Sequence, residues 1–172
     1  MNTMAAEARR KALCARLARV EGQVRGLQRL IEADTDPEKV AQQMAAAVGY
    51  TAELSLDAQL LQLLRLRVAQ MNPCSFCLIT HTKAAQDRGI GLEKVAHLAS
   101  WRESTMFSDA ERCALAYAEA LTAYDLAAFP SRHAALTGHF DQTAIAEIAA
   151  VVINMNVWTR LKLAQGAVPV EV

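Results

Sequence analysis

Apolar residues recur along most of the chain at intervals of three and four, which is the spacing of one face of an α-helix. In the first third of the chain such a seam is followed by Asp36 and Pro37, which predict the start of a second helix, from 37 to about 53. The sequence therefore predicts an N-terminal helical hairpin that needs another helix to cover its seam. The seam consists of Leu13, Leu17, Val20, Val24, Leu27 and Ile31.

Helix-capping residues and helix-breaking residues divide the rest of the chain into further helices. Strands should show alternating β-branched residues, and the sequence has no such pattern. The prediction is an all-α protein whose helix from 56 is apolar on most sides and lies at the centre. The predicted helices span about 56–71, 73–88, 92–100, 109–124, 131–138 and 142–164, with Ser55, Asn72, Ser108 and Asp141 as N-caps and Gly89 closing the second.

Charge is distributed unevenly along the 172 residues, although the net charge is zero. Residues 1–30 hold seven Lys and Arg against two Glu, a difference of +5. We divide the chain into a basic hairpin, 1–44, and a larger domain, 45–172. The neutral total makes a nucleic-acid partner unexpected, and the most apolar run, LLQLLRLRV, is too short and too charged to cross a membrane. The sequence predicts a cytoplasmic protein.

The run NPCSFCLITH, residues 72–81, carries the clearest chemistry. Cys74, Cys77 and His81 follow one another at steps of three and four, so a helix places them on one face. The free N–H groups at a helix start favour a thiolate, most of all at Cys74. His81 can take a proton from Cys77, which makes Cys77 the candidate for attack on a peroxide or disulfide, with Cys74 resolving the product.

Other interpretations of the cysteines and histidines remain. The cluster could fill a core, or could bind zinc, although no fourth ligand is evident. Haem attachment would need a histidine directly after the second cysteine, where Leu78 stands. We expect no metal and no organic cofactor. Cys14 and Cys113 are each isolated and are interpreted as core residues, and His97, His133 and His139 as surface or helix-end residues.

Three segments together carry a family resemblance: LLQLLRLRVAQMNPCSFCLITHTKAAQDRGI, HLASWRESTMFSDAERCALAYAEALT and INMNVWTRL. They resemble the carboxymuconolactone decarboxylase superfamily, most closely its alkylhydroperoxidase D-like (AhpD-like) branch, over about 45–165. The resemblance implies an AhpD-like helical bundle, a homo-oligomer, and a thiol peroxidase or disulfide reductase served by a dithiol electron donor. It assigns peroxide attack to Cys77, resolution to Cys74 and proton relay to His81.

One relay position departs from the family pattern. The family has a glutamate twelve residues before the first cysteine, and this chain has Gln62. An amide can hydrogen-bond to His81 but cannot carry its proton. The sequence therefore predicts a slow peroxidase, with a redox-responsive regulatory or binding protein as the alternative.

The N-terminal run RLARVEGQVRGLQRLIEAD, residues 16–34, resembles something different. It is similar to the first helix of the CsoR/FrmR-type repressors. Pro37 stands where that family has a ligand cysteine, so metal sensing should be lost. We interpret the hairpin as an oligomerisation or packing element, with DNA contact as the alternative.

Overall fold

The chain divides into two compact units, Met1–Ala52 and Glu53–Val172. The computed structural model describes residues 54–166 and, in the first unit, positions 7, 10, 11, 14, 15, 18, 21, 22, 25, 26, 28, 29 and 33. All of these positions up to 29 are helical, in agreement with the first predicted helix. The apolar seam, the second helix of the hairpin and the predicted boundary at residue 44 lie outside the described residues.

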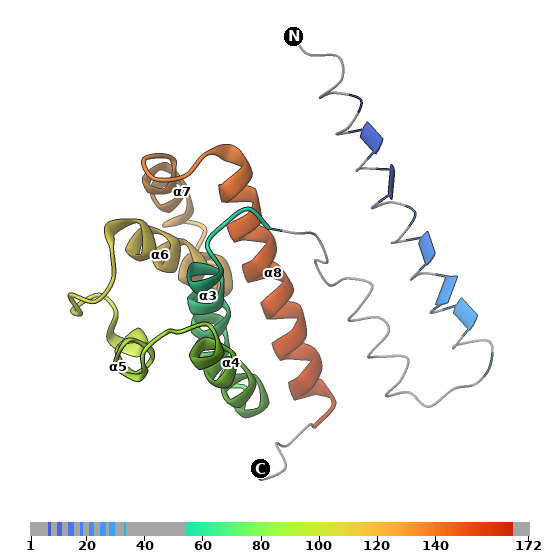
Figure 1. The fold of residues 1–172 in the computed structure, drawn as a ribbon, viewed down its shortest axis with the longest axis horizontal. Helices are drawn as coiled ribbons and strands as arrows, with labels where there is room; N and C mark the ends of the chain where they lie inside the picture. The colour runs from blue at the N-terminus through green and yellow to red at the C-terminus, as the bar shows by residue number, and fades with distance from the viewer. Residues whose placement is uncertain are drawn as a thin grey trace. The chain divides into compact units, whose positions relative to one another are not determined.

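The described part of the second unit is all-α, as predicted, and its helices form a bundle (Figure 1). A 3₁₀ turn, Leu98–Ser100, follows the shortest helix. No strand occurs between residues 54 and 166. The α-helices of this part are α3 (Ala58–Met71), α4 (Ser75–Asp87), α5 (Leu92–His97), α6 (Asp109–Ala123), α7 (Phe129–Thr137) and α8 (Gln142–Ala164).

Helix α3 is the centre of the bundle, as its sequence predicts. It packs against α4, α6 and α8, and Figure 1 shows it surrounded by them. Leu63, Leu64 and Val68 have no exposed surface. Complete burial of a side chain of this kind contributes roughly 1.5–3 kcal/mol each, so the apolar α3 provides a large share of the core.

Helix α8 has 23 residues and is apolar on nearly all sides. By length and composition it could cross a membrane, but half of its most apolar stretch is buried inside the fold. Its inner residues, among them Ile148 and Val152, pack into the same core as α3 and α6. This burial is typical of the core helix of a folded domain.

Three local capping predictions are confirmed. Ser108 and Glu111 form the predicted capping box at the start of α6. The side chain of Asp141 accepts from Ala144 N at 2.7 Å and caps α8. Gly89 has φ +75°, the left-handed conformation that ends a helix such as α4.

The predicted cap at Ser55 is wrong. Helix α3 begins at Ala58, and Asp57 is its N-cap, accepting from Leu60 N at 2.8 Å. Ser55 instead donates its backbone N–H to the Glu147 carboxylate on α8, at 2.9 Å. A partner 92 positions along the chain therefore overrides the local signal of Ser55.

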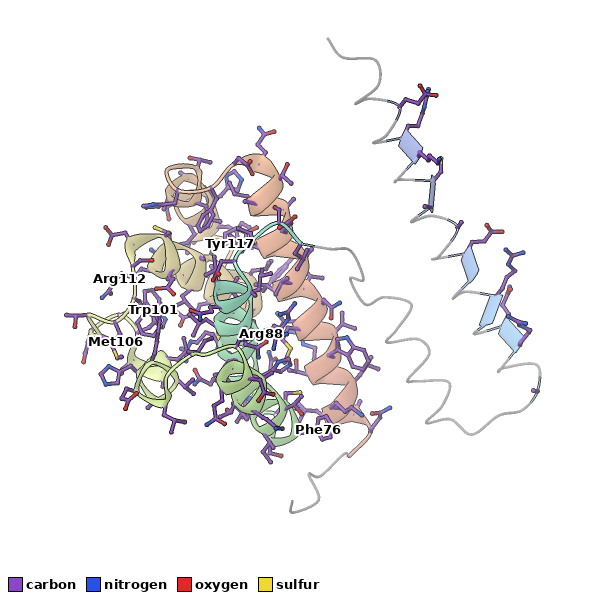
Figure 2. The ribbon with its side chains drawn as sticks, in the orientation of Figure 1. Phe76, Arg88, Trp101, Met106, Arg112 and Tyr117 are labelled. Carbon is purple, nitrogen blue, oxygen red and sulfur yellow. The ribbon has the colours of Figure 1, made fainter. Side chains whose placement is uncertain are left out.

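A buried carboxylate fixes the segment between α5 and α6 to the core. Glu119 accepts from Trp101 Nε1 and Arg67 Nε, both at 2.7 Å, and from Arg102. Burial alone would raise the pKa of Glu119, but these hydrogen bonds outweigh it and hold that pKa below its usual value. Arg112 donates to backbone carbonyls of the same segment, including Trp101 O at 3.1 Å, and Figure 2 shows the two residues close together.

Candidate functional site

The thiol motif lies at the turn between α3 and α4. Asn72 does not cap α4 as predicted, and Pro73 is not its first helical residue. Asn72 ends α3 instead, and its Nδ2 donates to Val68 O at 3.0 Å and to Asn156 Oδ1 of α8 at 3.1 Å. Because Asn72 is used in this way, α4 begins only at Ser75 and its N-cap is Cys74.

The two sulfur-bearing residues are in contact. The backbone N–H of Cys77 donates to Cys74 Sγ at 3.3 Å, so the sulfur acts as the capping acceptor of α4. Both residues are buried, with 2% and 4% of their surface exposed, and both are free thiols. Burial raises the pKa of the Cys77 thiol to about 12, with a further contribution from neighbouring Cys74 and an opposing one from Lys162. Cys77 is therefore protonated at neutral pH.

Gln62 and His81 are hydrogen-bonded. Gln62 Nε2 lies 2.9 Å from the backbone oxygen of His81 and 3.1 Å from His81 Nδ1. The glutamine is only 1% exposed, and it reaches from α3 to α4 across the interface of these two helices. His81 lies one turn after Cys77 on the same face of α4.

This pair of bonds determines the tautomer of His81. A carbonyl oxygen can only accept, so the Gln62 atom that faces it must be the amide nitrogen. The second N–H of that nitrogen then donates to Nδ1, which makes Nδ1 an acceptor. A neutral imidazole with an accepting Nδ1 carries its proton on Nε2. His81 therefore offers a proton donor at Nε2, whereas a general base would need a free acceptor there.

Cationic neighbours and burial keep the His81 ring neutral. Burial lowers the pKa of His81 to about 4, and the positive charges of Arg65 on α3 and Arg88 at the end of α4 contribute. Burial also lowers the pKa of Arg65, with a further contribution from Arg88. These guanidinium groups are thus close enough to each other and to the imidazole for their charges to interact.

We expect the protein to lose stability as the pH falls from 6.5 towards 4. In that window the unfolded chain protonates His81 but the folded protein does not, so acid favours unfolding. After allowance for solvent around this half-buried group, the contribution is about 1–2 kcal/mol. Thermal unfolding across this pH range should show a weaker pH dependence in His81→Gln than in the natural protein. The control, His133→Gln, changes an exposed histidine and should show the same pH dependence of thermal unfolding as the natural protein. An equal pH dependence in all three proteins would contradict the prediction.

The other predicted cysteines and histidines differ in outcome. Cys113 is half-buried and packs against the core, but the core interpretation of Cys14 is wrong, because Cys14 is exposed. The remaining histidines, His97, His133 and His139, are exposed, as predicted.

Between residues 54 and 166 no three His, Cys, Asp or Glu side chains gather as a metal ion would require.

Several residues around the thiols were not identified from the sequence. Arg65 lies on α3, Arg88 directly follows α4 and Lys162 lies on α8. Their spacing in the sequence gives no sign that the two arginines act on His81 or that Lys162 acts on Cys77. Asn156 of α8 accepts from Asn72 and donates through its Nδ2 to Thr122 Oγ1 of α6, at 3.1 Å. Asn156 therefore links the turn between α3 and α4 to both α6 and α8. Asn156 is one of several polar residues in α8, so the sequence alone does not single it out.

Comparison with known proteins supports the family resemblance. Residues 28–120 match the model of the carboxymuconolactone decarboxylase family, a range that includes the thiol motif and Gln62. The uncharacterized protein YdfG of Bacillus subtilis is 28% identical over 118 residues, which cover 68% of this chain and 80% of YdfG. The uncharacterized protein YnjA of Escherichia coli is 37% identical over 110 residues, covering 63% of this chain but only 60% of YnjA.

Two solved structures share the fold. One is a protein of unknown function from Agrobacterium tumefaciens, described as an AhpD-type antioxidant defence protein, with TM-score 0.65, 23% identity and coverage of 86% of this chain and 91% of that one. The other is an uncharacterized peroxidase-related protein from Silicibacter, with TM-score 0.65, 20% identity and coverage of 78% and 72%. The chain therefore belongs to the carboxymuconolactone decarboxylase family, and it has the AhpD-like fold.

Proposed function

We propose that the protein is a thiol-dependent oxidoreductase with an antioxidant role, which reduces a peroxide or a disulfide through Cys77 and Cys74. The observation that carries the proposal is the contact of Cys77 N–H with Cys74 Sγ, at 3.3 Å, at the first turn of α4. A pair held in this way can close to a disulfide with little backbone movement. The family and the fold support a peroxidase-like role at a coarser level.

The peroxide reaction balances with the residues present and one external reductant. The Cys77 sulfur attacks one oxygen of a hydroperoxide, the S–O bond forms, the O–O bond breaks, and the alcohol leaves with the thiol proton. Cys77 is then a sulfenic acid, oxidised by two electrons. The Cys74 thiol attacks that sulfur, the S–S bond forms, and water leaves. An external dithiol returns both residues to thiols and itself becomes a disulfide.

The test is oxidation of the reduced protein with one equivalent of cumene hydroperoxide, followed by thiol counting and mass spectrometry. We expect two thiols to be lost and a disulfide to appear in the tryptic peptide spanning residues 68–83, which contains both cysteines. A dithiol should reverse the change and sustain peroxide consumption. The control, Cys14→Ser with Cys113→Ser, should behave like the natural protein. Oxidation that links Cys14 or Cys113, or leaves the pair untouched, would contradict the assignment.

A second candidate is a redox-responsive regulatory protein. The observation in its favour is the raised pKa of Cys77, about 12, together with the donor tautomer of His81, since both slow attack by the thiol. A regulator needs to be oxidised only once per signal, whereas an antioxidant enzyme must cycle. Reversible disulfide formation without sustained peroxide consumption in the presence of a dithiol would favour this second function.

A further inference from the structure

A positive charge from α8 lies beside the thiol motif. Lys162 Nζ sits 4.9 Å from the centre of the Phe76 ring, and Phe76 directly precedes Cys77. Its charge acts on the Cys77 thiol and opposes the effect of burial on the thiol pKa. Figure 2 shows Phe76 at the end of the bundle where α8 finishes. The C-terminal turns of α8 therefore contribute a cation to the surroundings of the thiols.

Arginines from α3 and α4 add two more charges on the histidine side. Arg65 follows Gln62 by three positions, so it lies one turn along the α3 face that bonds to His81. Gln59, on the preceding turn of that face, donates to the backbone oxygen of Arg88 at 2.9 Å. The α3–α4 interface thus brings Arg65 and Arg88 to the two sides of the Gln62–His81 pair.

None of these three cations has a carboxylate partner within residues 54–166. In the same part of the chain, Arg67 pairs with Glu119 and Lys94 pairs with Glu111, each at 2.7 Å. The nearest acid in sequence to Arg88 is Asp87, and its carboxylate faces Lys83 at 4.0 Å. Gln62 removes the one carboxylate that the family pattern would place among them. Within the described residues, the cations beside His81 and the cation beside Phe76 therefore have no carboxylate that balances their charge.

Apolar surface adjoins this charge. Phe76 and Ile79, three positions apart on α4, are 37% and 50% exposed although both are large and hydrophobic. They flank Cys77 in sequence and lie at the start of the same helix. Positive groups beside exposed apolar side chains fit a ligand with an acid at one end and an apolar chain elsewhere.

We propose that the substrate reduced at Cys77 is an organic hydroperoxide that carries a carboxylate and an apolar chain, and that Arg65 and Lys162 select the carboxylate. The inference rests on the proposed peroxidase function and adds the substrate class. A site of positive charge attracts anions and raises their local concentration, by tenfold or more in the usual range of such effects. Neutral hydroperoxides with the same chain gain nothing from these charges.

The preference for anionic over neutral reagents at Cys77 can be measured without any peroxidase turnover. In the Cys74→Ser variant, alkylation of Cys77 by anionic iodoacetate and by neutral iodoacetamide gives a rate ratio that reports the local potential. We expect this ratio to exceed that of N-acetylcysteine amide by roughly tenfold at low salt and to fall as salt is added. Arg65→Gln and Lys162→Gln should each lower it, whereas Arg132→Gln, an exposed change of equal charge on α7, should not. A ratio equal to that of the small thiol would overturn the proposal.

Measurements of peroxide turnover test the substrate class separately from the peroxidase function. We expect kcat/KM for a fatty-acid hydroperoxide to exceed that for its methyl ester by roughly tenfold, and Arg65→Gln or Lys162→Gln to reduce the difference. If the two substrates react equally well, the charge selection is wrong and the peroxidase function stands. If iodoacetate is preferred but neither hydroperoxide is consumed, both the peroxidase function and the proposed substrate class are wrong.

Discussion

Replacing Cys77 by serine is expected to abolish peroxide consumption, whereas Cys74→Ser should leave one turnover per chain. Serine lacks the nucleophilic thiolate, so the first step of the proposed reaction should slow by roughly 10³-fold or more. Without the Cys74 thiol, the sulfenic acid at Cys77 cannot close to a disulfide and should accumulate. Stopped-flow peroxide measurements and trapping of the sulfenic acid with dimedone give the two readouts.

The control for these variants is Cys113→Ser, which removes a half-buried thiol from α6 and should leave the rate unchanged. The reverse pattern, with activity lost only in Cys74→Ser and sulfenic acid trapped on Cys74, would transfer the attack to the capping thiol. Cys74 Sγ already accepts an N–H at 3.3 Å, so that outcome has a structural basis and would correct the roles assigned from the family.

Replacing Gln62 by glutamate should accelerate peroxide attack by roughly 10²-fold, the lower end of general-base assistance. A carboxylate cannot donate to His81 Nδ1, so the ring must place its proton there and leave Nε2 free to accept from Cys77. The new charge should also raise the pKa of His81 from about 4 and be partly balanced by Arg65 and Arg88. Rate-versus-pH curves should then show a lower apparent thiol pKa.

The glutamate variant should also lose some stability, about 1 kcal/mol, because the bond from Gln62 Nε2 to the His81 carbonyl oxygen disappears. The matched control, Gln62→Met, keeps the length of the side chain without either hydrogen bond or charge and should not accelerate the reaction. If Gln62→Glu leaves rate and pH profile unchanged while Cys77→Ser abolishes activity, the proton leaves Cys77 through another group.

The sequence predicts those features that depend on neighbouring residues. The capping box at Ser108 and Glu111, the cap at Asp141 and the left-handed Gly89 are each local patterns, and each is found in the structure. Ser55 and Asn72 carry equally good local signals and fail. Their side chains bond to Glu147 and Asn156, which lie 92 and 84 positions away, and distant partners of this kind leave no mark in a local pattern.

The candidate site likewise has some features that the sequence predicts and others that depend on the folded bundle. Helical spacing is enough to place Cys74, Cys77 and His81 together at the start of one helix. The family pattern points to Gln62, and its bond to His81 is found. The protonation of Cys77 depends instead on how deeply α4 is buried, and its cationic surroundings depend on which helices pack against it. Both are properties of the assembled bundle and could not be read from spacing.

The use of Cys74 Sγ as the N-cap of α4 also bears on the reduction potential of the thiol pair. A sulfur committed to a disulfide points towards Cys77 Sγ and no longer receives the N–H of the first turn as well as it does now. Loss of an N-cap costs about 1 kcal/mol, which for a two-electron couple corresponds to about 20 mV. Because this cost falls on the oxidised form, it shifts the potential upward and makes the disulfide easier for a dithiol to reduce. In the proposed reaction, the same helix start that bonds to the reduced sulfur would therefore favour its return to the reduced state.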